Sequence, residues 1–133
     1  MSTIAGGAQS GFQNGFGNQA SFYYPWGIYF DSSSKDLIIT DQGNFAIRKM
    51  NQSGIFKFTF CVTNQKVNYF HIKLKSINKG YVSTIAGNGI QGINDGQGTL
   101  AQFWSPSCVT MDSIGNIYVG DWCAIRIINS TGL

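Results

Sequence analysis

The chain has 133 residues, 17 of them glycine, with 11% charged residues and a formal net charge of +3 at pH 7. This length suits one ordinary domain, and abundant glycine with sparse charge favours short strands joined by tight turns over a helical bundle. No apolar run approaches the ~20 residues that cross a bilayer, and the first residues show neither the basic region nor the hydrophobic stretch of a secretory signal, so neither feature is expected.

Two copies of one pattern organise the sequence. Residues 2–6 (STIAG) recur as residues 83–87, and a glycine-rich linker follows each of them at the same offset. The recurring residues of the first copy are Gly11, Gly15, Gly17, Ala20, Phe22, Pro25, Asp31 and Ser32, and those of the second are Gly92, Gly96, Gly98, Ala101, Phe103, Pro106, Asp112 and Ser113. Such internal periodicity indicates a repeat architecture. Because the pattern is already present at residue 2, we expect the chain to be part of a longer array.

Each copy is predicted to form short strands in a regular order. The first copy favours strands over residues 26–31, 37–41 and 46–50, with a fourth strand returning over residues 82–86. The second copy repeats the same order as far as an Ile-Arg strand that begins at Ala124. Four short antiparallel strands per unit are typical of a β-propeller blade.

Residues 55–80 have no counterpart in either copy. They contain five lysines and no acid, so the rest of the chain has a net charge of −2, and a nucleic-acid partner is not expected. Apolar and polar residues alternate over 56–60 and 72–75, which would suit a hairpin. Alternatively, joining Gly54 to Tyr81 restores a continuous repeat, and the Phe, Ile, Lys, Asn and Tyr bias of the segment would suit a translated intron. Sequencing the mature transcript separates these two hypotheses.

The second copy reads strand-Asp, I-R, S-T-I-A-G and D-G-x-G-x-x-A-x-F-x-x-P in the combination that resembles the NHL repeat. It departs at Ser107-Cys108, where the first copy has the family-like Trp26-Gly27. The resemblance covers residues 2–54 and 82–132, as two NHL-like repeats separated by the insertion. It implies an all-β fold, a partial β-propeller of about two blades. Such propellers generally act as non-enzymatic scaffolds, so the implied partner is a protein, a peptide or a glycan.

Two kinds of side chain are candidates for a role at the repeat ends. Asp41 with Arg48, and Asp121 with Arg126, are interpreted as structural charge-assisted pairs, because arginine is a poor proton-transfer group. Aromatic residues in or beside the linkers are the candidate partner-binding anchors, since they supply contact area at low entropic cost. These residues are Tyr23, Tyr24, Trp26, Trp104 and Trp122.

No catalytic, cofactor-binding or metal site is expected. Residues 87–92 spell G-x-G-x-x-G, but no helix follows to meet a pyrophosphate, and the first copy lacks the middle glycine. The three cysteines show no C-x-x-C spacing and the chain has one histidine and no glutamate. The alternative function is a fragment of a metal-dependent propeller enzyme of the lyase or lactonase type, which would need several convergent ligands. For Cys108 and Cys123 the sequence is compatible both with a disulfide and with two free thiols.

Two blades would leave a sheet edge and an apolar face open at each flank. Repeat arrays need about three units to bury a continuous core, and open edges favour association. We therefore expect the chain alone to associate, aggregate or fold only in part, and expect its biological form to be a longer chain or a closed multimer.

Overall fold

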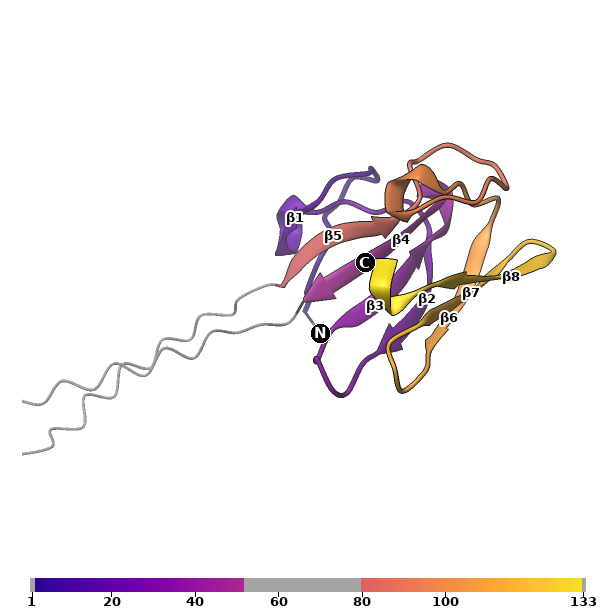
Figure 1. Ribbon diagram of the computed structural model, residues 1–133. Coiled ribbons are helices and arrows are strands. Elements are labelled where there is room, and N and C mark those ends of the chain that lie inside the picture. The colour runs from indigo at the N-terminus through magenta and orange to yellow at the C-terminus, as the bar shows by residue number, and fades with distance from the viewer. Residues whose placement is uncertain (1, 52–79, 133) are drawn as a thin grey trace, which may run out of the picture.

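The computed structural model describes residues 2–51 and 80–132, which form an all-β fold of two antiparallel sheets (Figure 1). The strands of the first sheet are β1 (Gly15–Phe16), β2 (Pro25–Phe30), β3 (Leu37–Asp41), β4 (Ala46–Asn51) and β5 (Tyr81–Ala86). Those of the second are β6 (Pro106–Met111), β7 (Ile117–Asp121) and β8 (Ala124–Ile128). The helical segments of these residues are the short 3₁₀ turns Gly17–Gln19, Gln42–Asn44, Gly98–Leu100 and Ser130–Gly132, none long enough to cross a membrane.

The first sheet has the strand order β1-β5-β4-β3-β2, and the second has the order β6-β7-β8. The four strands predicted in the first copy are confirmed, each with a shift of no more than one residue at its ends. Strand β5 pairs with β4 in antiparallel register, with Asn51 opposite Tyr81. The strand after the predicted insertion therefore completes the first sheet. The insertion itself, residues 55–80, lies outside the described residues except for Gly80.

The main core lies between the two sheets. Strand period places Ile38 and Ile47 on the face of the first sheet that covers the second, where they are buried with Ile117 and Val119 of β7. The two sheets contact each other where Thr40 Oγ1 of β3 donates a hydrogen bond to the carbonyl of Ser107 of β6, at 3.1 Å. Figure 1 shows the second sheet lying beside β2 and β3.

The opposite face of the first sheet packs on the linker that precedes it. Leu37, Ile39 and Met50 form a second core cluster there with Val82 and with Ala20 of the linker. In the second copy Ala101 and Phe103 of the linker lie in the core between the sheets. Phe22 packs partly buried against the second cluster, so the recurring alanine and phenylalanine of the linker pack under a sheet in both copies.

The glycine-rich segment over residues 87–92 forms a turn of the backbone. Gly87 and Gly89 have φ of 90° and 84°, in the left-handed region that other residues rarely adopt. A side chain at Gly87 would overlap the carbonyl oxygen of Phe45. The three-residue 3₁₀ turn that follows begins only at Gly98, so within the described part of the chain no helix N-terminus faces these glycines.

An aspartate organises the turn between β2 and β3, and another organises the corresponding turn between β6 and β7. Asp31 accepts hydrogen bonds from the hydroxyls and backbone N–H groups of Ser33 and Ser34, which hold the pKa of this carboxyl well below its usual range. Desolvation raises the pKa of Asp112, but hydrogen bonds from Asn116, Tyr118 and the backbone of Ile114 outweigh it, and the net direction is down. Both turns therefore favour the charged carboxylate.

The lowered pKa values predict a loss of stability in acid. A carboxyl whose folded-state pKa is depressed stabilises the fold above its unfolded value of about 3.9, and this stabilisation is lost as the pH falls through the folded pKa. We expect the urea concentration at half-unfolding to decrease as the pH is lowered below about 4. In the double variant Asp31→Asn, Asp112→Asn the midpoint should be lower at pH 7 and fall less steeply in acid. An unchanged acid slope in this variant would contradict the assignment.

Candidate binding site

A buried ion pair ties the first linker to the first sheet. Asp41 ends β3 and Arg48 lies opposite Ile39 on β4, and both side chains are fully buried with Arg48 Nη1 2.6 Å from Asp41 Oδ2. The guanidinium also donates to the carbonyls of Gln13 and Ser21 and to Asn14 Oδ1, at 2.8, 3.1 and 3.0 Å. Asp41 Oδ1 in turn accepts from the backbone N–H of Tyr23.

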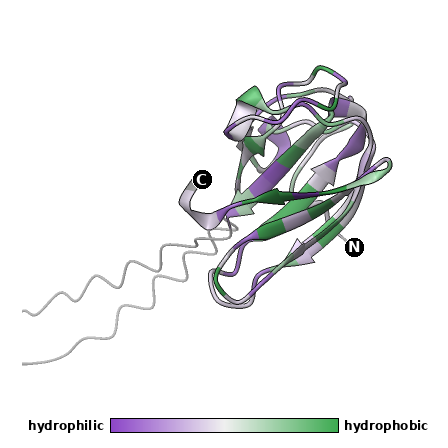
Figure 2. Cartoon of the chain, turned by 45° about the vertical axis from the view of Figure 1, so that its right-hand side comes forward, coloured by the Kyte–Doolittle hydropathy of each residue, from purple (hydrophilic) through white to green (hydrophobic). Residues whose placement is uncertain are grey.

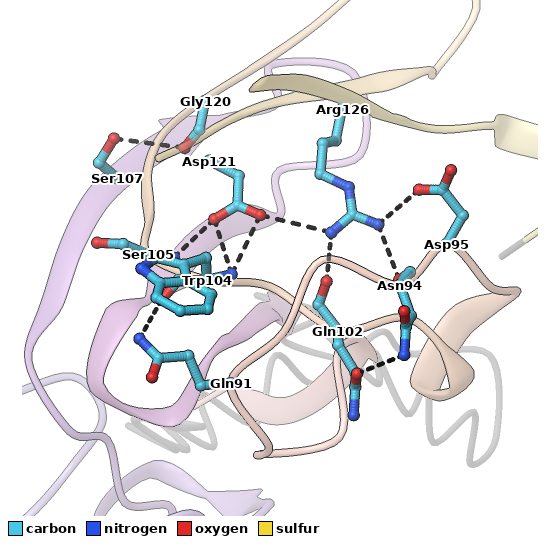
Figure 3. Close-up of polar contacts among 10 residues, drawn as sticks. All are labelled: Gln91, Asn94, Asp95, Gln102, Trp104, Ser105, Ser107, Gly120, Asp121 and Arg126. Carbon is cyan, nitrogen blue, oxygen red and sulfur yellow. Dashed lines mark hydrogen bonds and ion pairs between the residues drawn. The ribbon is translucent and has the colours of Figure 1, made fainter. Parts of the chain in front are cut away.

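The second copy repeats this arrangement at the same positions (Figure 3). Arg126 Nη1 lies 3.4 Å from Asp121 Oδ2 and also donates to the carbonyl of Gln102. Arg126 Nη2 donates to the carbonyl of Asn94 at 3.0 Å and lies 2.7 Å from Asp95 Oδ1. Asp121 Oδ1 accepts from the backbone N–H groups of Trp104 and Ser105.

Both pairs hold the backbone of the linkers. In each copy the arginine binds carbonyls at corresponding linker positions, and the aspartate binds the N–H of the aromatic residue near the end of the linker. Arginine offers several N–H donors in a planar fork, so the ion pair can bind two linker carbonyls at once. Its physical effect is to fix where the linker aromatics emerge.

The structure brings four of the five predicted aromatic anchors into two pairs. The rings of Tyr23 and Tyr24 have centroids 4.7 Å apart, and those of Trp104 and Trp122 are 6.4 Å apart. The pairs lie at corresponding ends of the two sheets, where the linkers enter β2 and β6 and where β3 and β7 end. Trp26 is exposed on β2 and belongs to neither pair.

Polar residues join the two pairs into one surface. The backbone N–H of Gln42 donates to the carbonyl of Tyr24 at 3.2 Å, and Gln42 Nε2 donates to Ser105 Oγ at 3.1 Å. Ser105 follows Trp104 directly in the chain. We call this surface the aromatic rim, and it consists of Tyr23, Tyr24, Gln42, Trp104, Ser105 and Trp122.

Two rim residues combine high exposure with an unfavourable backbone conformation. Tyr24 has φ of 50° and is 66% exposed, and Trp122 has φ of 49° and is 74% exposed. Bulky L residues rarely adopt this left-handed conformation, which costs about 1–2 kcal/mol. An exposed ring in a strained turn recovers little of this cost by packing, and such strain is characteristic of functional sites.

The remaining predicted features are distributed as follows. Cys108 and Cys123 are free and exposed, whereas Cys61 and His71 lie outside the described residues. Over residues 2–51 and 80–132, no three His, Cys, Asp or Glu side chains gather in a way that could hold a metal ion. Asp95, at the linker position that Asn14 occupies in the first copy, pairs with Arg126.

Sequence reasoning missed the polar bridge of the rim. Gln42 and Ser105 stand in unlike contexts, one after a strand and one before a proline, and no motif connects them. The shared signal that could have found them is the repeat itself, since it places both loops at the same ends of neighbouring sheets.

No family model and no curated protein matches this sequence. Solved structures do. The chain superposes on an auxiliary nutrient binding protein from Bacteroides thetaiotaomicron with a TM-score of 0.61 and 20% identity, over 89% of this chain and 25% of that protein. It superposes on a protein from the same organism that carries a provisional phosphatase name with a TM-score of 0.66 and 23% identity, over 96% of this chain and 26% of that protein. The chain thus shares a fold with about a quarter of each.

Proposed function

We propose that this chain is part of an NHL-like β-propeller and acts as a non-enzymatic interaction module that binds a protein, peptide or glycan through the aromatic rim. The observation that carries the proposal is the pair of exposed rings, Tyr24 and Trp122, held in left-handed backbone at the same edge of two sheets. The likeness to a nutrient binding protein supports a binding role.

The chemistry of the rim fits a flat or extended ligand. Four aromatic rings offer apolar faces, and the side-chain amide of Gln42 and the hydroxyl of Ser105 lie between the two pairs. Rigid aromatic side chains lose little entropy on binding, and adjacent polar groups give direction to hydrogen bonds. The buried pairs Asp41–Arg48 and Asp121–Arg126 keep both ends of this surface in place before a ligand arrives.

Strain at Trp122 allows a variant that separates binding from folding. Trp122→Asn removes the ring and places a residue that tolerates left-handed backbone, so we expect the free energy of unfolding to rise by about 1 kcal/mol. Binding to the best ligand from an oligosaccharide array or a peptide library should weaken at least about tenfold, as for a hot-spot aromatic. Tryptophan fluorescence measures ligand binding, and urea denaturation measures the free energy of unfolding.

The matched control is Lys35→Asn. Lys35 is exposed, has φ of 65° and lies in the β2–β3 turn at the other end of the sheet, so its replacement should relieve similar strain and leave binding unchanged. Equal ligand affinity of the wild type and the Trp122→Asn variant would reject the aromatic rim as the binding site. Tight stoichiometric uptake of Ca²⁺ or Zn²⁺ in calorimetry would instead favour the metal-dependent enzyme.

A further inference from the structure

Each sheet has one outer face with exposed hydrophobic residues. The exposed residues on these two outer faces are the repeat counterparts of residues on the two faces that pack together in the core. Ile47 of β4 is fully buried against the second sheet, whereas Ile125, its counterpart on β8, is 78% exposed. On the opposite side Val109 and Met111 of β6 pack against the core, whereas their counterparts Ile28 and Phe30 on β2 are exposed. Figure 2 brings the second sheet forward and shows hydrophobic residues along its strands.

A strand position is also open. Residues 83–86 of β5 pair with β4, and the identical sequence at residues 2–5 belongs to no strand in the described chain. Strand β8 carries the Ala-Ile-Arg sequence of β4, and its outer edge has no partner strand within the described residues. Strand β8 matches β4 in sequence, and residues 2–5 match residues 83–86 of β5. The β4–β5 pairing therefore shows how β8 and residues 2–5 could pair.

We propose that copies of this chain associate head to tail, with residues 2–5 of one copy adding as a strand to β8 of the next. The pairing in the first sheet predicts the register: Ile47 lies opposite Ala86 and Arg48 opposite Thr84, so Ile125 pairs with Ala5 and Arg126 with Thr3. The face of β2 that carries Ile28 and Phe30 then covers Ile125 and Ile127 of the neighbour. This contact repeats the interface between the two sheets of one chain.

A second copy is the proposed partner because the two surfaces do not meet within the described residues of one chain. Residues 2–5 lie on the linker side of the first sheet, where Ala5 packs against the buried cluster of Leu37 and Ile39. The second sheet lies on the other face of the same sheet, so its open face points away from residues 2–5. A contact between two different surfaces is heterologous and gives a closed ring or an open filament.

One residue weakens the copied interface. Gly27 approaches the second sheet so closely that a side chain would overlap the carbonyl oxygen of Ser107. Its counterpart on β6 is Cys108, whose side chain would meet the corresponding carbonyl of the neighbouring copy, that of Trp26. Cys108→Gly is therefore expected to tighten self-association about tenfold, because relief of overpacking at a packed interface has effects of this size.

Complementation tests the head-to-tail arrangement in the 133-residue chain. The tail variant Ile125→Lys, Ile127→Lys charges the open face of β8, and the head variant Thr3→Pro, Ile28→Lys blocks the added strand and its sheet. All four positions are exposed, so both variants should fold, as their thermal melts by circular dichroism will show. By light scattering on a sizing column, wild type should form multimers and each variant alone should be monomeric.

An equimolar mixture of the two variants retains one intact head and one intact tail, so it should form dimers and nothing larger. The control Leu100→Lys charges an exposed position whose counterpart is Gln19, and it should associate as wild type does. Monomeric wild type, multimers of either variant alone, or a mixture that stays monomeric would each overturn the proposal. None of these variants alters the aromatic rim, so the outcome is independent of the ligand-binding test.

Discussion

Arg48→Ala is expected to lower the free energy of unfolding by about 3–5 kcal/mol, the usual cost of removing one partner from a buried ion pair. Arg48 and Asp41 are both fully buried, so the variant leaves a carboxylate without its countercharge in the interior. The carbonyls of Gln13 and Ser21 lose their donor at the same time. Because a domain of this size has a total stability of about 5–15 kcal/mol, the variant should be close to unfolding.

Aromatic packing adds to this loss. The guanidinium carbon of Arg48 lies 5.0 Å from the ring centroid of Phe12 and 5.2 Å from that of Phe22. A cation held over aromatic rings in a desolvated site is stabilised by about 2 kcal/mol or more. Arg48→Lys keeps the charge but cannot supply the planar set of donors that the linker carbonyls use, so it should recover only part of the stability.

The neighbouring residue provides the matched control. Lys49 pairs with Asp36 at 2.8 Å, but its side chain is 36% exposed, and a pair of this kind contributes only about 0–1 kcal/mol. Lys49→Ala should therefore shift the urea midpoint slightly, whereas Arg48→Ala shifts it strongly. A double variant Asp41→Ala, Arg48→Ala should lose less than the sum of its single variants, because the two residues interact directly. Strict additivity would show that the pair is not coupled.

The repeat made much of the fold predictable from the sequence. A strand signal that occurs in both copies, in the same order, is stronger evidence than one that occurs once. The strands over residues 37–41 and 46–50 lie where this repeated order placed them. The sequence could not predict β1, because Gly15 and Phe16 have no strand pattern of their own. They form a strand only because β5 supplies an edge beside them.

The candidate site was only partly predictable, for a related reason. Composition and position within the linkers pointed to the aromatic residues, but their grouping depends on backbone conformation. Tyr24 and Trp122 adopt left-handed φ although neither is a glycine or asparagine, so no turn motif indicates it. The arginine pairs were visible because they recur, whereas most of their linker partners are backbone carbonyls, which every sequence contains.

Removing residues 55–80 is expected to leave the fold intact and to raise the free energy of unfolding by about 2 kcal/mol. Asn51 and Tyr81 already lie opposite each other at the ends of β4 and β5, with the N–H of Tyr81 donating to Asn51 Oδ1 at 3.0 Å. The variant joins them through residues 52–54, and three-residue hairpin loops with a final glycine are common. Loop-closure entropy falls by about 0.6 kcal/mol for each halving of the connection, and this connection shortens about tenfold.

The residue before Tyr81 determines whether the shortened hairpin closes. Gly80 occupies this place in the full chain, its carbonyl accepts from the N–H of Gly17 at 3.1 Å, and a side chain there would overlap the carbonyl oxygen of Asn51. In the shortened chain Gly54 takes this place, so the glycine requirement is still met. Changing Gly54→Val in the shortened chain alters no length but introduces the overlap, and should cancel the gain. Urea denaturation of the three proteins measures the effect, and a shortened chain that fails to fold while the full chain folds would show that residues 55–80 are needed for the first sheet.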